Sequence, residues 1–420
     1  MTKDLRRTLG LIDAVGIGVG AIVGAGIFVV LGVAAGISGP ALLVGLLLAG
    51  AGATANALSS AQLAASYPRA GGTYEYGYRV LSPWAGYVAG WMFLVSKIAA
   101  AGTVALGLGG YLSPHLPGVS PRFIGVVAVA LFTALNYTGV RRSSAVNLVI
   151  VGLSVTALLV FVAAGASAIQ QENFSPFAPN GSRGVLEGAA LLFFAYTGYA
   201  RIATLGEEVR EPRRTIPRAI VLTIVFTLVL YALVAVVAVG VAGAESLAAS
   251  SAPLEVAARR AGGHWLALVV GVGGITAMAG VLLSQLLGLS RMTFAMARRR
   301  DLPAGLDRVH SRSGVPHRGV VVVGLAAAAV TVTGTLSGVV AAAAFAILIY
   351  YGVANVAAIR MPTGSKIIPD VVPWVGVTIC ALLALSLSWK TVLTGLVILG
   401  IGILARLIFA GPQTRNRDTS

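Results

Sequence analysis

The stretch Gly16-Ile-Gly-Val-Gly-Ala-Ile-Val-Gly-Ala-Gly-Ile-Phe28 decides the fold. It lies in an apolar run over residues 9–33, which is long enough to cross a bilayer as a helix and too long for a signal peptide. Its glycines recur every four residues at the start and share one helix face, which is typical of close helix packing. The glycines at 24 and 26, in mid-span, favour a break in the helix.

A second apolar run is interrupted in a similar way. The segment Phe194-Ala-Tyr-Thr-Gly198 lies near the middle of a run over residues 185–205, five predicted spans after the first. An odd number of spans in each repeat would insert the second half of the chain upside down. Paired interrupted helices in corresponding places are the best indication from sequence of a transporter's binding site.

The composition excludes an ordinary soluble domain, and the lack of certain motifs argues against several classes of pump and enzyme. The 420-residue chain is 57% hydrophobic and only 10% charged, whereas soluble domains carry about 25% charged residues. Its one cysteine, Cys380, permits no disulfide within the chain. There is no Walker A motif, no HExxH and no placed serine–histidine pair. We therefore expect neither an ATP-driven pump nor an enzyme, with no cofactor and no metal site.

The apolar runs predict an all-α integral membrane protein with about twelve transmembrane helices. The predicted spans are residues 11–36, 40–66, 83–112, 123–137, 145–169, 185–205, 217–241, 265–289, 319–335, 338–359, 371–387 and 392–409. Short turns near 334–338 and 388–391 leave ten or eleven spans open.

The placement of charge predicts the orientation. With a cytoplasmic N-terminus, most of the 30 lysines and arginines fall in cytoplasmic segments, as the positive-inside rule requires. We therefore expect a multi-pass plasma-membrane protein with both termini in the cytoplasm. Because the net charge of +16 at pH 7 sits between apolar runs, it indicates topology and no nucleic-acid partner.

A broken helix within the bilayer is itself a binding device. Each backbone group freed in lipid costs several kcal/mol unless it meets a partner. The second half-helix would offer free N–H groups and a positive dipole end to a carboxylate. Carbonyls freed at the end of the first half-helix would suit an ammonium group, so one break could bind the part common to all amino acids.

Three motifs resemble the amino acid–polyamine–organocation (APC) superfamily of permeases. Gly18-Val-Gly-Ala-Ile-Val-Gly-Ala-Gly-Ile-Phe28 is similar to the first-helix signature, and Pro68-Arg-Ala-Gly-Gly-Thr-Tyr-Glu-Tyr76 to the segment after the second helix. Phe194-Ala-Tyr-Thr-Gly-Tyr199, followed by Glu207-Glu208-Val-Arg-Glu-Pro-Arg-Arg-Thr-Ile-Pro217, is similar to the sixth helix and its loop. The likeness covers about residues 8–358, and these motifs give little information about the identity of the substrate.

The resemblance implies a five-plus-five inverted-repeat (LeuT-like) core with discontinuous helices 1 and 6. The first repeat would be residues 1–169, the second 185–359, and two further helices would follow over 371–410. The resemblance also implies that N–H groups of Ala25, Gly26 and Ile27 bind the carboxylate. The substrate site as a whole would comprise Ala21, Ile22, Gly24, Ala25, Gly26, Ile27, Phe194, Tyr196, Thr197 and Gly198.

The amine would meet carbonyls near Ala21, Ile22, Phe194 and Thr197. Phe194 is the expected aromatic gate over the substrate, with Tyr196 and Tyr199 as alternatives. Ordinary packing is the competing interpretation for all three rings. We expect Asp13, Arg201, Tyr199, Glu207 and Glu208 to contribute to gating, whereas solvated helix-end charge is the alternative for the four charged residues.

Lys97 is the most informative single residue, because it sits midway along the third predicted span. A lysine at the bilayer centre costs about 2.5–3.5 kcal/mol on insertion scales, which makes it a functional-site hypothesis by default. Burial disfavours its charged form. Lys97 could therefore exchange a proton during transport or pair with an acidic substrate, and it would disfavour lysine or arginine as substrate. Snorkelling to the interface is the structural alternative.

The sequence gives less direct evidence for the identity of the coupling ion. Some APC members carry a lysine on the fifth helix, but the matching stretch, Asn147-Leu-Val-Ile-Val-Gly-Leu-Ser154, has none. A sodium site would want hydroxyls from the eighth span, which offers Thr276 and Ser284 without an adjacent pair. A proton is therefore the expected coupling ion and sodium the less favoured one.

Together these features predict a secondary active permease that works by alternating access. The leading hypothesis is proton-coupled uptake of neutral or broad-range amino acids. Exchange of one amino acid for another is the nearest alternative, and a membrane-embedded amino-acid sensor without transport is a more distant one.

Overall fold

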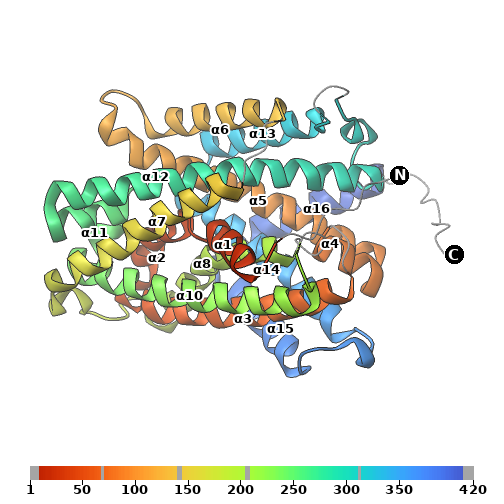
Figure 1. Cartoon of the computed structure of the whole chain (residues 1–420), viewed down its shortest axis with the longest axis horizontal. Coiled ribbons are helices and arrows are strands. Elements are labelled where there is room, and N and C mark those ends of the chain that lie inside the picture. Colours follow the sequence, from red (N-terminus) through yellow and green to blue (C-terminus); the bar gives the residue numbers. More distant parts are fainter. Residues whose placement is uncertain (1–8, 68–70, 140–143, 204–208, 311–313, 410–420) are drawn as a thin grey trace.

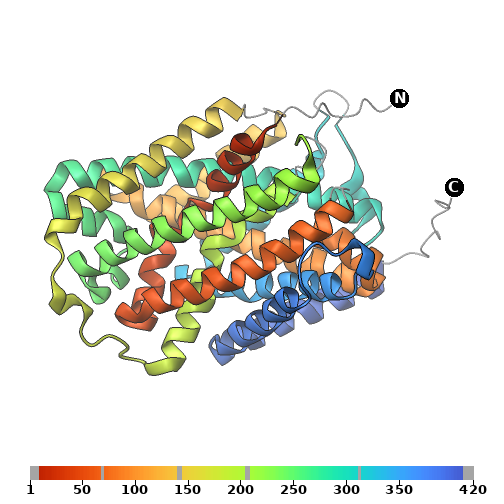
Figure 2. The same ribbon diagram turned by 60° about the horizontal axis from the view of Figure 1, so that its bottom comes forward.

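The computed structural model describes residues 9–67, 71–139, 144–203, 209–310 and 314–409, and nearly all of them are helical. Figures 1 and 2 show long helices packed along a common direction around shorter, tilted segments near the centre. Between the described residues, the only β pairing is an isolated bridge that joins Leu9 to Val209. The expectation of an all-α protein is confirmed.

The first apolar run is interrupted where the glycines predict it. Helix α1 (Leu11–Ile22) ends at Val23, whose extended backbone (φ −70°, ψ 107°) cannot continue a helix. A single π-helical turn, η1 (Gly26–Val30), and helix α2 (Leu31–Ser38) complete the run. Short π-helical turns are often found at functional sites.

The second interrupted run has a different local structure. Helix α8 (Gly181–Phe193) passes into a 3₁₀ segment, η7 (Phe194–Tyr199), and then into helix α9 (Ala200–Ala203). The winding tightens here but the chain does not open. A 3₁₀ segment has three residues per turn, so residues three apart lie on the same side.

Each of the predicted spans coincides with a helical segment of the structure. Apart from the two interrupted runs, the matching helices are α3 (Leu42–Ser66), α5 (Pro83–Leu112), α6 (Pro121–Tyr137), α7 (Ser144–Gly165), α10 (Pro212–Ala242), α12 (Pro253–Arg298), α13 (His317–Thr333), α14 (Leu336–Ile359), α15 (Val371–Ser386) and α16 (Trp389–Phe409). The bounds mostly agree to within a few residues. The exception is α12, which extends 12 residues before the predicted start at 265 and contains a non-helical Gly263 (φ 73°).

Several short elements were not predicted from the sequence. After α3, helix α4 (Thr73–Tyr76) and the π-helical η3 (Gly77–Leu81) form a compact segment before α5. Helix α11 (Ala244–Ala248) follows α10. The loop between α7 and α8 carries two 3₁₀ turns, η5 (Ala166–Ala168) and η6 (Gln171–Phe174).

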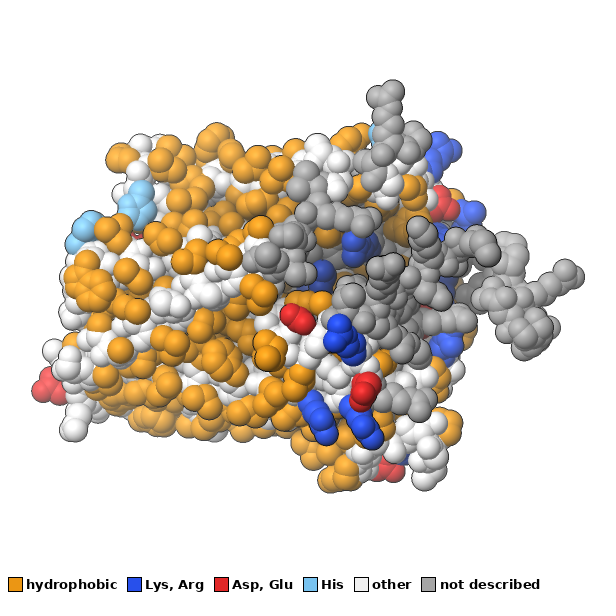
Figure 3. All heavy atoms as spheres, viewed as in Figure 1, with side chains coloured by type: hydrophobic (Ala, Val, Ile, Leu, Met, Phe, Trp, Pro, Cys, Tyr) orange, Lys and Arg blue, Asp and Glu red, His pale blue; other side chains and the backbone are white. Residues whose placement is uncertain are grey.

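The described helices are long and apolar enough for a multi-pass membrane protein. Seven helical stretches meet the length and hydropathy expected of a membrane span, and three shorter apolar helices accompany them. Large apolar side chains face outward, among them Leu325 (66% exposed), Leu385 (76%) and Ile408 (74%). Figure 3 shows this apolar surface over most of one face. The total number of spans and the inverted repeat stay predictions.

Lysine and arginine side chains gather toward one end of the bundle in the same view. The visible lysine and arginine side chains gather at the end where α12 finishes and α16 contains Arg406, and the opposite end carries few charges (Figures 1 and 3). That opposite end contains α11 and the start of α12. The two ends therefore differ as the two faces of a membrane protein do under the positive-inside rule.

Candidate functional site

A small cavity lies where the two interrupted runs meet α5 and α12. It has a volume of about 40 Å³, enough for roughly three water molecules at the ten to fifteen Å³ that each one requires. Its lining residues come from four segments: Ala21, Ile22, Gly24, Ala25, Gly26, Lys97, Ala100, Val104, Phe194, Ala195, Thr197, Gly198, Val281 and Gln285. The predicted broken helices thus come together around one site.

Glycine permits the close approach of the two interrupted runs. A β-carbon at Gly198 would lie 2.2 Å from the carbonyl oxygen of Ala21, and one at Gly26 would lie 2.5 Å from the Cα atom of Ala195. Both neighbours are backbone atoms, which have little freedom to move aside. The backbones therefore contact each other directly, as small residues at helix interfaces allow.

Several of the backbone groups predicted to bind a substrate already have partners. The Ile27 N–H donates to the Gly24 carbonyl (3.2 Å), so Ala25 and Gly26 remain the stronger candidates for a carboxylate. The Ile22 carbonyl accepts from the Tyr231 hydroxyl (3.0 Å). A carbonyl oxygen has a second lone pair, so Ile22 still has one acceptor position for an ammonium group.

The second interrupted run offers similar carbonyls. The Phe194 carbonyl accepts from the Thr197 hydroxyl (3.0 Å), and the Thr197 carbonyl accepts from the Tyr351 hydroxyl (3.3 Å). These bonds hold the 3₁₀ segment in place. The predicted amine site is therefore fixed in position before a ligand arrives.

Lys97 lines the cavity from α5. Its Nζ atom lies 3.4 Å from the Thr197 hydroxyl oxygen and 5.9 Å from the centre of the Phe93 ring. Of the described residues that line the cavity, none is an aspartate or a glutamate. The ammonium group therefore has hydroxyl and aromatic neighbours within the site and no counter-charge from its walls.

Gln285 is a site residue that the sequence analysis missed. It lines the cavity from α12, and its Nε2 atom donates to the Lys97 carbonyl at 2.7 Å. This bond ties α12 to α5 at the level of the lysine. The sequence did contain a signal, because Gln285 is an uncharged polar residue deep within an apolar run.

The three candidate aromatic rings separate into two groups. Phe194 lines the cavity, together with Thr197 three residues later. Tyr196 and Tyr199, also three residues apart, are fully buried and lie on another side of the 3₁₀ segment. Tyr196 packs against Tyr231 with ring centres 5.5 Å apart. The geometry therefore favours Phe194 as the aromatic residue at the site.

Tyr199, Asp13 and Arg201 are not among the residues that line the cavity. The Tyr199 ring stacks on Tyr351, with ring centres 5.2 Å apart. Asp13 is exposed and accepts from the Gly10 N–H (2.9 Å) at the start of α1, which is a helix-capping contact. Arg201 lies on α9, which faces Gly288 of α12. Glu207 and Glu208 lie outside the described residues, so the gating role stays a prediction.

The region predicted for a sodium ion is built from side chains that bond within their own helix. The Thr276 hydroxyl donates to the Val272 carbonyl (2.8 Å) and the Ser284 hydroxyl to the Val281 carbonyl (3.0 Å). On α7, the Asn147 side chain lies beside Gly20, because a β-carbon there would approach its Nδ2 atom to 3.0 Å. Among the described residues these contacts give no specific support to sodium.

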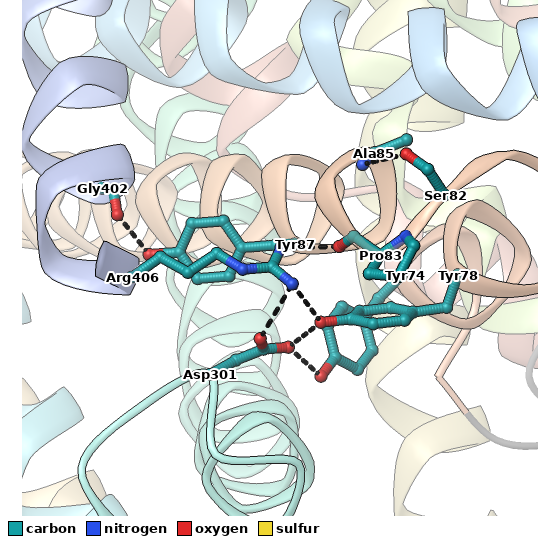
Figure 4. Close-up of polar contacts among 9 residues, drawn as sticks. All are labelled: Tyr74, Tyr78, Ser82, Pro83, Ala85, Tyr87, Asp301, Gly402 and Arg406. Carbon is teal, nitrogen blue, oxygen red and sulfur yellow. Dashed lines mark hydrogen bonds and ion pairs between the residues drawn. The ribbon is translucent and has the colours of Figure 1, made fainter. Parts of the chain in front are cut away.

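A buried polar network lies at the charged end of the bundle, away from the cavity (Figure 4). Asp301 follows α12 and is 2% exposed, and its Oδ2 atom accepts from the hydroxyls of Tyr74 (2.6 Å) and Tyr78 (2.5 Å). Arg406 of α16 is 3% exposed and lies 3.7 Å from Asp301. It also donates to the Pro83 carbonyl (2.6 Å).

This network explains the second APC-like motif. The motif places Tyr74 and Glu75 on α4, where Glu75 pairs with Arg299 at the end of α12 and with Arg79 of η3. The guanidinium of Arg299 lies 5.2 Å from the centre of the Tyr74 ring. The motif therefore fastens the segment after α3 to α12 and, through Asp301, to α16. Burial is the main reason that the pKa of Tyr74 is well above its ordinary value.

Comparison with known proteins gives a consistent result. The sequence model of the family described as amino acid permease matches residues 13–412. An uncharacterized transporter of Mycobacterium tuberculosis is 44% identical over 404 residues, covering 96% of this chain and 91% of the relative. A branched-chain amino acid permease of Bacillus subtilis is 28% identical (98% and 95% covered). A methylthioribose transporter of the same species is 30% identical (97% and 94% covered).

Proposed function

Since this chain belongs to the amino acid permease family, we propose that it carries neutral or broad-range amino acids into the cell together with protons. The chain is then a secondary active transporter of the plasma membrane, with both termini in the cytoplasm. Its cycle is alternating access around the cavity between α1 and η7. A five-plus-five inverted repeat, accompanied by two further helices for about twelve spans in all, provides the moving parts.

The cavity supports an amino-acid substrate through its backbone groups. The N–H groups of Ala25 and Gly26 lie at the beginning of a helical half, where an anion is favoured. The carbonyls of Ala21 and Thr197 lie across the same cavity. A zwitterion placed between them meets a donor at its carboxylate and an acceptor at its amine. Phe194 then covers the side chain.

The single observation that supports coupling to protons is the position of Lys97. Its ammonium group lines a cavity whose described walls contain no carboxylate. Holding a charge in such a place is unfavourable without a counter-charge. Lys97 therefore gives up its proton in one part of the cycle and regains it in another. A lysine or arginine substrate would add a second positive charge, and for this reason we propose neutral substrates.

The test is uptake of labelled amino acids into proteoliposomes with and without an inward proton gradient. We expect Lys97→Met to lose stimulation by the gradient while it retains exchange of internal for external substrate. Lys390→Met, at an exposed lysine of α16, is the matched control and should behave as the native protein does. Met is an unbranched, uncharged side chain one atom shorter than Lys, so it removes the charge together with the contact to the Thr197 hydroxyl.

The alternatives give different results in the same assay. If the gradient has no effect on the native protein, and efflux requires external substrate, the protein is an exchanger. If an amino acid binds in detergent but no flux occurs in either mode, the protein is a sensor. Stimulation by a sodium gradient instead of a proton gradient would contradict the role of Lys97.

A further inference from the structure

Two helices complete the wall of the cavity beside the two interrupted runs. Helix α5 contributes Lys97, Ala100 and Val104, and α12 contributes Val281 and Gln285. Successive members of each set are three or four residues apart, so each set lies on one face of its helix. In the proposed binding mode the interrupted runs hold the carboxylate and the amine of the substrate. The side chain of the substrate therefore lies against α5 and α12.

The side chain that fits against these helices is short. The cavity has a volume of only about 40 Å³. Val281 closes it on one side, because a β-carbon at Gly24 would lie 2.9 Å from the Val281 Cγ2 atom. Of the five lining residues from α5 and α12, only Lys97 and Gln285 have polar side chains. Substrates of one size are therefore distinguished by the hydrogen bonds that they offer to these two residues.

The orientation of the Gln285 amide follows from its one hydrogen bond. The bond to the Lys97 carbonyl, at 2.7 Å, has a donor on the glutamine. A carbonyl oxygen can only accept, so the amide atom that faces it is Nε2, and Oε1 is the other end of the amide. Among the described residues, no group donates to Oε1. The second N–H of the same amide is also unused.

The other polar side chains of the cavity wall offer less. The Thr197 hydroxyl donates its only proton to the Phe194 carbonyl at 3.0 Å, and its oxygen lies 3.4 Å from Lys97 Nζ. A lysine ammonium group donates and cannot accept. Within the described cavity wall, Gln285 is therefore the side chain that has both a free acceptor and a free donor.

We propose that Gln285 is a specificity-determining residue that selects amino acids with a hydroxyl or a carboxamide on a short side chain. Such a group donates to Gln285 Oε1 and accepts from Lys97 Nζ, which carries N–H groups in either charge state. The inference rests on the proposed function, because it takes the interrupted runs to bind the carboxylate and the amine. It narrows the neutral substrates of that proposal to polar ones.

An apolar side chain of the same shape is rejected because of what it displaces. Before a substrate binds, water in the cavity can donate to Oε1. An apolar group expels that water and replaces none of its hydrogen bonds, which lowers affinity. The buried acceptor is then left without a donor, and a site built to hydrogen-bond its substrate discriminates strongly against an analogue that lacks the donor.

The bond from Gln285 to the Lys97 carbonyl also ties α12 to α5, and this structural role must be separated from recognition. Loss of the tie alone would alter the cavity for every substrate. Two substrates of the same shape would then lose affinity by a similar factor. Loss of recognition changes the ratio between the two affinities. The ratio is therefore the quantity to measure.

Threonine and valine form the first pair of substrates, since they share one shape and differ by a hydroxyl in place of a methyl group. Asparagine and leucine form a second pair of similar shape with a carboxamide. Equilibrium binding of each labelled amino acid to the purified full chain in detergent gives its dissociation constant. We expect the native protein to bind the polar member of at least one pair at least about fivefold more tightly, as one buried acceptor without a donor implies.

Gln285→Met removes the amide, and in this variant the preference should disappear. Gln285→Asn is a second variant that keeps an amide but shortens the side chain by one methylene group, and it should also reduce the preference. Ser284→Ala is the matched control on α12. The Ser284 hydroxyl donates to the Val281 carbonyl of its own helix and is not part of the cavity wall, so this variant should keep the native ratio.

Three results would overturn the inference. In the first, the native protein carries amino acids but prefers the polar member in neither pair, and the proposed function then stands without this specificity. In the second, the folded Gln285 variants weaken both members of a pair by the same factor, and Gln285 then has a structural role only. In the third, no amino acid is bound or carried, and the proposed function fails as well.

Discussion

Replacing Gly198 with alanine should separate the two interrupted runs. The new β-carbon would lie 2.2 Å from the Ala21 carbonyl oxygen, whereas 3.4 Å begins the range of ordinary contacts. The backbones would have to move apart by the difference, 1.2 Å. The Ala21 carbonyl belongs to the predicted amine site, so the shift moves acceptors on one run away from those on the other.

The magnitude follows from the cost of overpacking. Forcing an extra methyl group into a packed site costs about 1–3 kcal/mol, and each 1.4 kcal/mol changes a dissociation constant about tenfold. The free variant relaxes by moving the two runs apart, and binding that needs the native spacing must meet this cost, so we expect Gly198→Ala to weaken amino-acid binding at least about fivefold. Binding of labelled substrate to purified protein in detergent measures this change, and thermal unfolding shows whether the variant is folded.

A matched control is available in a neighbouring helix. A β-carbon at Gly352 of α14 would meet no atom within 4 Å, and its φ is not positive. Gly352→Ala should therefore keep native affinity and stability. If Gly198→Ala binds substrate as tightly as Gly352→Ala does, the approach of the two runs does not determine the binding geometry and the reasoning fails.

Two further predictions concern the network and the aromatic gate. Arg406→Met should lower the free energy of unfolding by about 3–5 kcal/mol, because Asp301 would remain buried without its counter-charge. Arg214→Met, which breaks an exposed pair at 3.7 Å, should change it by less than about 1 kcal/mol, and equal shifts in thermal unfolding would contradict the prediction. Phe194→Ala should weaken substrate binding, whereas Tyr196→Phe should not, and the opposite order in a binding assay would assign the gate to Tyr196.

The sequence predicted the interruption of the first run and singled out Lys97 because both signals are local. A glycine pair in the middle of an apolar run indicates a break in the helix, whatever the tertiary position of that helix. A lysine within an apolar span can likewise be recognised without knowledge of its neighbours. The family resemblance already favoured Phe194 over the two tyrosines, but the sequence offered no physical reason for that choice. It depends on the 3₁₀ winding of η7, which places Phe194 and Thr197 on one side.

Features that join distant parts of the chain could not be read from the sequence. Tyr74 and Asp301 are 227 positions apart, and Gln285 and Lys97 are 188 positions apart. Each partner looks like an ordinary residue at a helix end or within a span. Helix α11 and the start of α12 were not predicted for a related reason, because they are too short or too polar to resemble a span.

The position of Arg406 has a consequence for synthesis of the protein. Helix α16 leaves the ribosome long after α4 and α12, yet it carries the charge that balances Asp301. Before α16 joins the bundle, Asp301 lacks this counter-charge, although the Tyr74 hydroxyl and the Glu75–Arg299 pair can already hold α4 against α12. We therefore expect a chain without α16 to be less stable at this end of the bundle than the full chain. The ion pair thus makes the stability of segments that are made early depend on a helix that is made late.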